Sequence, residues 1–272
     1  MRPRALTAPT RRRVAADLDH WHHAVELRRE WRDIGLATEP ADRDAAEEVL
    51  TRLYRRHGRA RPRFAWASSP RDALPLTSGM PTHDDLRGWL RPRQPPGRPP
   101  LAGDIAAGWS RLMRALDEGA DPCLGPLRPP GKNAKPWPVL PPPAALAAGV
   151  PLGEVLRQGV RGALRTVLMD SVVLPVRATL APPRRVPVAW WGQQDAYWIG
   201  YHDVLRRLGL AQHGPVVGGR LDEWATLARS CGWWWPGEEV CVVVERLARI
   251  EHVPFPDDTL PEPAHPAVTY RT

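Results

Sequence analysis

The stretch Gly232–Arg246 reads GWWWPGEEVCVVVER, three tryptophans followed by a turn and an apolar run. The Pro-Gly dipeptide at 236–237 is typical of turns. The run Val240–Glu245 is rich in β-branched residues, and its neighbours Val242 and Val243 would point to opposite faces of a strand. This pattern predicts a short strand that is covered by other elements on both sides.

The three consecutive indoles of Trp233–Trp235 raise two alternatives, burial and ligand binding. Indoles stack on bases and enclose cations, usually among Arg or Lys side chains. Here the turn continues with Glu238 and Glu239, two acids that would repel phosphate. We therefore expect the indoles to close one end of a small sheet inside the protein.

Apolar residues at helical spacing predict several helices around this strand. The first helix has an apolar stripe from Val14 to Val25, and Gly35 is a typical stop signal. Pro175 should kink or end the longest one. The predicted helices cover 14–34, 41–57, 151–180, 194–208 and 221–230, and further short strands are expected at 63–67, 188–191 and near 266–272. The fold class predicted is α+β, predominantly helical, with a small and mostly C-terminal β-sheet.

The 33 prolines concentrate between residues 70 and 143. Segments such as RPRQPPGRPPLAG cannot hold regular helix or sheet, whereas 104–119 has the pattern of an amphipathic helix. We therefore expect a basic disordered N-terminus over 1–13 and a single helix-rich domain over 14–272. Within that domain, 75–150 is predicted to be a proline-rich surface connection that contains one helix, 104–119.

The net charge of +8 permits nucleic acid or another anion as a partner. The 38 basic residues are, however, interleaved with 30 acids, and only two of them are lysines. Arginines in the last turn of a helix are also explained by the helix dipole. The nucleic-acid candidates are Arg11, Arg12, Arg13, Arg55, Arg56 and Arg59.

The chain has no run of about 18 consecutive apolar residues that would predict a membrane span. Its basic N-terminus lacks the apolar stretch of a secretory signal. The three cysteines Cys123, Cys231 and Cys241 form no C-x-x-C pair, so neither a disulfide framework nor a zinc site is predicted. These features lead us to expect a cytoplasmic protein without a membrane partner.

The segment QQDAYWIGYHD over 193–203 offers a candidate ligand cleft, lined by Gln194, Asp195, Trp198 and His202. Asp195 and His202 are two helical turns apart, roughly 10 Å of rise, so they share a face but cannot form a hydrogen-bonded pair. The alternative is an amphipathic helix with a polar edge. No residue is assigned a catalytic role.

A metal site has a weak candidate in Asp19, His23 and Glu26, which share one face of the first predicted helix. The alternative, an exposed helix face, is favoured because no second ligand segment accompanies them. The segment GPLRPPGKN lacks the spacing and the hydroxyl of a phosphate loop. Ser69 with Pro70 and Asp72 is typical of a helix start. We therefore expect no metal and no cofactor.

Several C-terminal segments resemble a family of uncharacterised proteins from high-GC bacteria, known only as a domain of unknown function. The segments are WWGQQDAYWIGYHDVLRRLGL, CGWWWPGEEVCVVVERLARIEHVP and PAVTYRT, with PADRDAAEEVLTRLYRRHG, FAWASSP and LRTVLMDSVVLPVRATL upstream. The family commonly ends in L-H-x-x-D-G-P-A-V-x-Y, of which only Pro266, Ala267, Val268 and Tyr270 match here. The resemblance implies an architecture and no activity.

Three functions remain open at this stage. A non-catalytic protein-interaction module fits best, because proline-rich segments and aromatic residues suit protein contacts. A nucleic-acid or anion-binding protein is the second alternative. An enzyme with its cleft on the 194–208 helix is the third, so an enzymatic role is disfavoured but not excluded.

Overall fold

The structure of the chain is a computed structural model. It describes residues 10–82, 85–86, 89, 96–125, 140–180, 187, 190–250 and 268–270. The expected segments at 188–189 and 266–267 lie outside this part of the chain, as does most of the basic N-terminus. The α+β class with predominant helix is confirmed, and the main sheet draws two of its three strands from the C-terminal third.

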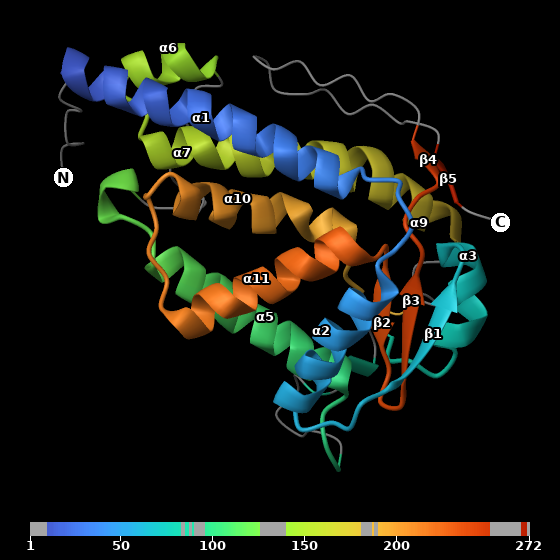
Figure 1. Cartoon of the computed structure of the whole chain (residues 1–272). Coiled ribbons are helices and arrows are strands. Elements are labelled where there is room, and N and C mark those ends of the chain that lie inside the picture. The colour runs from blue at the N-terminus through green and yellow to red at the C-terminus, as the bar shows by residue number, and fades with distance from the viewer. Residues whose placement is uncertain are drawn as a thin grey trace.

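The main sheet has the strand order β1-β3-β2, with the predicted strand at its centre (Figure 1). Its strands are β1 (Arg63–Ala67), β2 (Trp234–Pro236) and β3 (Val240–Val244). β1 runs parallel to β3 with Ala65 opposite Val242, and β2 runs antiparallel to it. A separate two-stranded ladder joins β4 (Arg249–Ile250) to β5 (Val268–Thr269), which confirms a strand near the predicted C-terminal position.

Both faces of the main sheet are covered, as the sequence predicts. Alternate residues of β3 enter two different apolar clusters: Val243 joins the helical core, whereas Val242 and Val244 join a smaller cluster on the other face. The indoles of Trp233–Trp235 are 3%, 0% and 0% exposed, so their predicted burial is confirmed. Trp234 stacks on Trp191 with 5.0 Å between ring centroids. Trp234 also belongs to the helical core cluster, so the tryptophan-rich segment packs the sheet against the helices.

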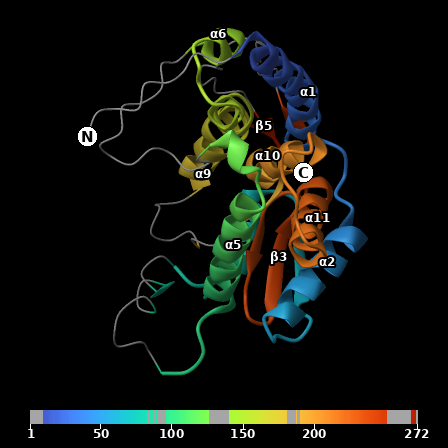
Figure 2. The same ribbon diagram turned by 90° about the vertical axis from the view of Figure 1, so that its left-hand side faces the viewer.

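The helices form the larger part of the molecule and enclose the central α10 (Figures 1 and 2). Their bounds are α1 (Arg11–Gly35), α2 (Arg43–Arg56), α3 (Pro70–Ala73), η1 (Leu74–Thr77), α5 (Leu101–Glu118), η2 (Pro122–Leu124), α6 (Pro142–Ala147), α7 (Leu152–Leu156), η3 (Arg157–Gly162), α8 (Ala163–Arg165), η4 (Thr166–Val173), α9 (Leu174–Leu180), η5 (Gln193–Asp195), α10 (Ala196–Arg207) and α11 (Pro215–Ser230).

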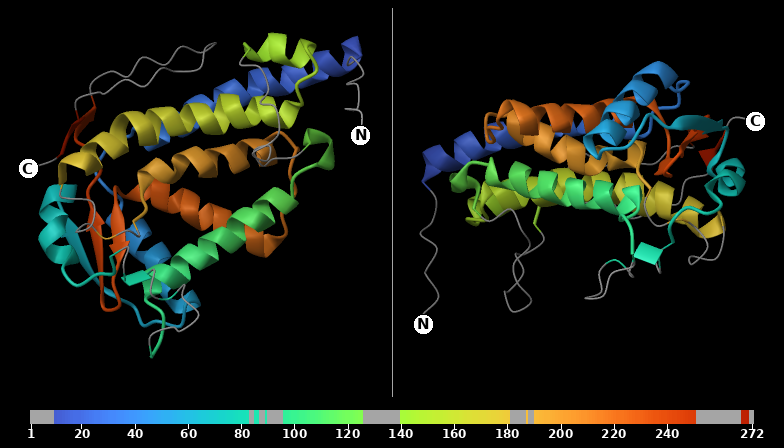
Figure 3. Two further views of the ribbon diagram at one scale, coloured as in Figure 1. Left: turned by 180° about the vertical axis from the view of Figure 1, so that it is seen from behind. Right: turned by 90° about the horizontal axis from the view of Figure 1, so that it is seen from below.

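The elements from α7 to α9 form one continuous helical rod that runs beside α1 (Figure 3). Two of its segments, η3 and η4, are π-helical, with wider turns than an α-helix. Gly159 in η3 lies against the ring of Trp21, so that a Cβ there would be 2.4 Å from the indole. Arg28 of α1 donates to the carbonyl of Gly159 at 2.8 Å. The absence of a side chain at 159 therefore allows the two helices to approach.

Three sequence predictions about element bounds need correction. α1 begins at Arg11, because Thr10 caps it, so residues 11–13 are helical and not disordered. The 75–150 region contains more than one helix: η2 and α6 also lie in it, and each starts at a proline, which is favoured at the first helical position. The helix expected over 104–119 begins three residues earlier, at Leu101. Pro175 does not end the long rod, which continues from η4 through α9 to Leu180 although proline removes one backbone donor there.

The predicted helix start at Ser69 is confirmed. The backbone N–H of Asp72 donates to Oγ of Ser69 at 3.2 Å, and Pro70 occupies the first helical position. Within the part of the chain that the structure describes, no helix combines the length and the apolar character needed to cross a bilayer.

Candidate functional site

The four candidate cleft residues on and before α10 are buried. Gln194 is 3% exposed, Asp195 9%, Trp198 0% and His202 0%. They belong to the interior where η5 and α10 meet the other helices, and none of them lines the two surface pockets described below. Their polar atoms therefore face the protein interior, where His202 lies among other polar side chains.

Asp195 has a structural role at the start of α10. Its carboxylate accepts hydrogen bonds from the N–H of Gly192 and from Nε1 of Trp198, both at 2.9 Å. Burial raises the pKa of Asp195 to about 7, although these two hydrogen bonds oppose the rise. The carboxylate thus holds the chain reversal before α10 and orients Trp198.

The metal candidates Asp19, His23 and Glu26 are exposed on α1. Among the described residues, no three His, Cys, Asp or Glu side chains are grouped in a way that could hold a metal ion.

The nucleic-acid candidates do not form one surface. Arg11–Arg13 begin α1 at one end of the molecule, whereas Arg55–Arg59 lie at the far end of α2, as both views show (Figures 1 and 2). Arg56 forms an ion pair with Glu223 at 2.5 Å. Arg59 is enclosed by acids and its side chain is 7% exposed. Much of the positive charge at the end of α2 is therefore neutralised.

A pocket of about 490 Å³ lies beside the turn between β2 and β3, and we call it the hairpin pocket. The turn forms one wall, residues 76–81 form a second wall, and the start of α5 forms a third. Both apolar and charged side chains line it. Its lining includes Arg59, Leu76, Met80, Arg98, Leu101 and Glu238.

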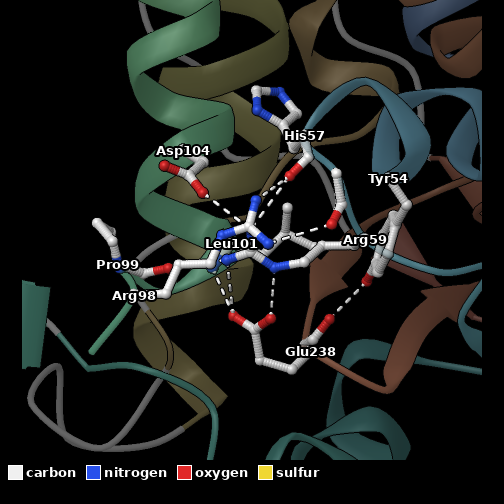
Figure 4. Close-up of polar contacts among 10 residues, drawn as sticks. Tyr54, His57, Arg59, Arg98, Pro99, Leu101, Asp104 and Glu238 are labelled. Atoms are coloured by element: carbon white, nitrogen blue, oxygen red, sulfur yellow. Dashed lines mark hydrogen bonds and ion pairs between the residues drawn. The ribbon is translucent and has the colours of Figure 1, made fainter.

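Arg59 and Glu238 form the polar wall of the hairpin pocket (Figure 4). Nε of Arg59 donates to Glu238 at 2.7 Å, and Nη1 lies 3.2 Å from the carboxylate of Asp104 on α5. Glu238 also accepts from the N–H of Leu101 at 2.7 Å, at the first residue of α5. The end of α2, the start of α5 and the hairpin turn are therefore joined through one guanidinium and one carboxylate.

The ionisation of these groups follows from the contacts. Burial acts to raise the pKa of Glu238, but hydrogen bonds from Arg59 and from the N–H of Leu101 outweigh it and lower that pKa. The hydrogen bond to Glu238 raises the pKa of Arg59. Both groups are charged at neutral pH. Because Arg59 and Glu238 neutralise each other, this pair can orient a polar ligand without adding net charge to the wall.

Arg98 also belongs to this wall, and its hydrogen-bond partners are neutral backbone carbonyls. Its guanidinium donates to the carbonyl of Gly58 at 3.1 Å and to the carbonyl of His57. The hydroxyl of Tyr54 donates to the carbonyl of Gly237 at 2.8 Å and so holds the turn in place (Figure 4). These bonds fix the pocket walls before any ligand arrives.

A second depression of about 470 Å³ lies between α3 and α9 and is mainly apolar. Its lining includes Pro70, Arg71, Val176, Leu180 and Tyr270. The short segment α3–η1 lies between this depression and the hairpin pocket.

The chain was compared with protein-family models, with curated proteins and with solved structures, and no match was found. The resemblance noted in the C-terminal motifs therefore has no support from a family model and stays an expectation.

Sequence reasoning missed the hairpin pocket. Arg59 was noted only as one of several basic residues, and Glu238 only as a neighbour of the indoles. The two lie 179 residues apart in the chain, and no motif spacing links them. The sequence nevertheless held one indication. Glu238 and Glu239 directly follow the Pro-Gly turn, and acids at an exposed turn are available to pair with a basic side chain from another element.

Proposed function

We propose that this chain is a non-catalytic protein-interaction module that takes an extended segment of a partner protein into the hairpin pocket. The observation that supports it is the composition of the pocket. Apolar side chains such as Leu76 and Met80 lie beside a fixed, charge-matched wall of Arg59 and Glu238. Such mixed surfaces are typical of peptide recognition.

The pocket also favours a particular kind of segment. Leu76 is 45% exposed, which leaves apolar area for a partner side chain to cover. Glu239 is exposed at the rim beside Glu238. A segment with an apolar side chain next to a Lys or Arg would complement both features.

The experiment is a selection of random peptides displayed on phage against the intact chain, followed by affinity measurements on the selected peptides. Leu76→Asp should reduce affinity at least tenfold, because it places a carboxylate on the apolar wall. The matched control is Val216→Asp, since Val216 is 67% exposed at the start of α11 and outside the pocket lining. The control should stay within twofold of the wild type.

Two outcomes would reject the proposal: no peptide enriched over background, or equal losses in both variants. A labelled oligonucleotide in the same assay tests the nucleic-acid alternative. Tight binding that falls steeply with salt would favour that alternative, which the ion pairs of Arg56 and Arg59 weigh against. An enzymatic cleft at 194–202 has less support, because those side chains are buried.

A cytoplasmic location belongs to the same proposal. It is supported by the free thiols of Cys123, Cys231 and Cys241, since unpaired cysteines are typical of reducing compartments.

A further inference from the structure

Two adjacent residues of α10 bury polar atoms that have no hydrogen-bond partner among the described residues. Tyr201 is 1% exposed and His202 is 0% exposed. The hydroxyl of Tyr201 and both ring nitrogens of His202 are without a partner there. Because an unsatisfied buried polar group costs roughly 1–3 kcal/mol, three such atoms together need an explanation.

A second histidine, His213, lies in the segment after α10 and is close enough to His202 to act on its charge. Both ring nitrogens of His213 are likewise buried without a partner in the described part of the chain. Its ring lies against Gly119, where a Cβ would be 2.4 Å from Nδ1. Two backbone bonds at 2.8 Å hold this segment to the end of α5, from Gln212 to Gly119 and from Asp121 to Leu210. The position of His213 is therefore set by the backbone.

Two charged side chains from other elements lie near His202. Asp117 of α5 has its Oδ1 4.0 Å from Nε2 of His202, beyond hydrogen-bond distance. Arg161 of η3 lies beside α10, with its guanidinium 6.0 Å from the ring centroid of Tyr197. Burial, together with the positive charges of Arg161 and His213, lowers the pKa of His202 to about 3. The buried imidazole of His202 is therefore neutral at neutral pH, with a guanidinium and a carboxylate nearby.

Part of the cluster is in contact with solvent. The side chain of Asp117 is 24% exposed, and Arg161 and His213 are half-buried. Among the described residues, no three metal-binding side chains are grouped suitably for a metal ion, and the cluster is no exception. It offers imidazole N–H groups, a phenol and a guanidinium, which are the donors that bind oxyanions.

We propose that Tyr201, His202, His213 and Arg161 form a binding site for a small oxyanion, of the phosphate type. A bound oxyanion accepts hydrogen bonds from the buried donors and stabilises the protonated form of His202. Binding therefore strengthens as the pH falls from 8 to 6. Asp117, the acid at the rim, opposes the anion. This site is separate from the hairpin pocket and does not depend on the function proposed for it.

The test uses inorganic phosphate as the probe and the intact chain. Thermal unfolding at pH 6 should show a higher Tm in phosphate than in sodium chloride of equal ionic strength, with a smaller difference at pH 8. Arg161→Gln and His213→Asn change half-buried side chains and should reduce the phosphate affinity at least tenfold. The matched controls are Arg165→Gln, one turn further along the same rod, and His22→Asn on the exposed face of α1.

A direct readout accompanies the unfolding data. The ring nitrogen resonances of His202 should shift on phosphate addition in the wild type and in both controls. His202→Gln should abolish the phosphate-specific gain; if that variant does not fold, Arg161→Gln and His213→Asn decide. The proposal is wrong if chloride gives the same Tm increase, if the cluster variants keep the phosphate effect, or if the controls lose it equally.

Discussion

Gly200 of α10 packs directly against Trp31 of α1, so that a Cβ built on the glycine would lie 2.6 Å from Cγ of the indole. The indole cannot move away easily. Its Nε1 donates to the carboxylate of Asp203 at 2.9 Å, and Arg229 stacks on its ring at 4.5 Å. The contact between the two central helices therefore depends on the absence of a side chain at 200.

Gly200→Ala should destabilise the protein by about 1–3 kcal/mol through overpacking. The clash should outweigh the gain of about 1 kcal/mol that alanine brings to a helix. The matched control is Gly219→Ala in α11, where a Cβ meets nothing within 4 Å, and a gain of about 0.5–1 kcal/mol is expected. Urea unfolding of both variants measures the difference, and equal effects would contradict this account.

Asp195 and His202 should give opposite dependences of stability on pH. The folded pKa of His202 is lowered from 6.5 to about 3, so the unfolded chain binds the extra proton and stability rises with pH across that window. The folded pKa of Asp195 is raised from 3.8 to about 7, so the folded chain binds the extra proton and stability falls with pH. Between about pH 4 and pH 6.5 the two slopes oppose each other, each at roughly 1.4 kcal/mol per unit.

Replacing one of the two residues at a time should therefore reveal its own contribution to the dependence of stability on pH. Relative to the wild type, His202→Gln should lose stability as the pH rises from 4 to 6.5, and Asp195→Asn should gain it. The free energy of unfolding, measured by chemical denaturation at three pH values without phosphate, tests both signs. Parallel curves for the wild type and the two variants would show that these groups titrate normally.

Glu238→Gln should weaken the polar wall of the hairpin pocket in a pH-dependent way. Its lowered pKa means that the carboxylate stabilises the fold above its ordinary value of 4.5 and loses this effect as the pH falls. Because the side chain is 53% exposed, the loss should stay below about 1 kcal/mol at pH 7. The difference from the wild type should disappear near pH 3, and a constant difference across the range would argue against this origin.

Arg246 joins the C-terminal ends of two helices. Its Nη2 donates to the carbonyls of Ile34 in α1 and Ala228 in α11, both at 3.2 Å. Arg246→Met should cost about 1–3 kcal/mol, because two buried carbonyls lose a charged donor. The control Arg207→Met removes a surface ion pair to Glu30 and should cost about 1 kcal/mol or less. A thermal shift of equal size in both variants would refute the role of Arg246.

Some features could be predicted because they depend on local pattern. The continuous apolar run of Val240–Val244 indicates a strand with two covered faces, and Ser69 with Pro70 indicates a helix start. The early start of α11 at Pro215 was missed because glycines and β-branched valines dilute the helical pattern there. The helices η2 and α6 were missed because the prolines at which they start are also typical of loops.

The sites depend on contacts between distant parts of the chain. Nothing in the order of residues indicates that Arg59 meets Glu238, or that His213 reaches the cluster around His202. The sequence predicted His202 on the wall of a cleft or on a polar helix edge, and only the packing shows that it is buried and which groups surround it. The weak spacing argument that excluded an Asp195–His202 pair agrees with the structure, in which Asp195 bonds to Trp198 instead.

The parallel pairing of β1 with β3 has a consequence for synthesis on the ribosome. The central strand of the sheet is among the last described segments to be translated, about 175 residues after its neighbour β1. Until β3 leaves the exit tunnel, the apolar undersides of α2 and β1 have no sheet to join, and a nascent chain of that kind is prone to aggregate. The main sheet therefore cannot be completed until almost all of its described residues have been synthesised.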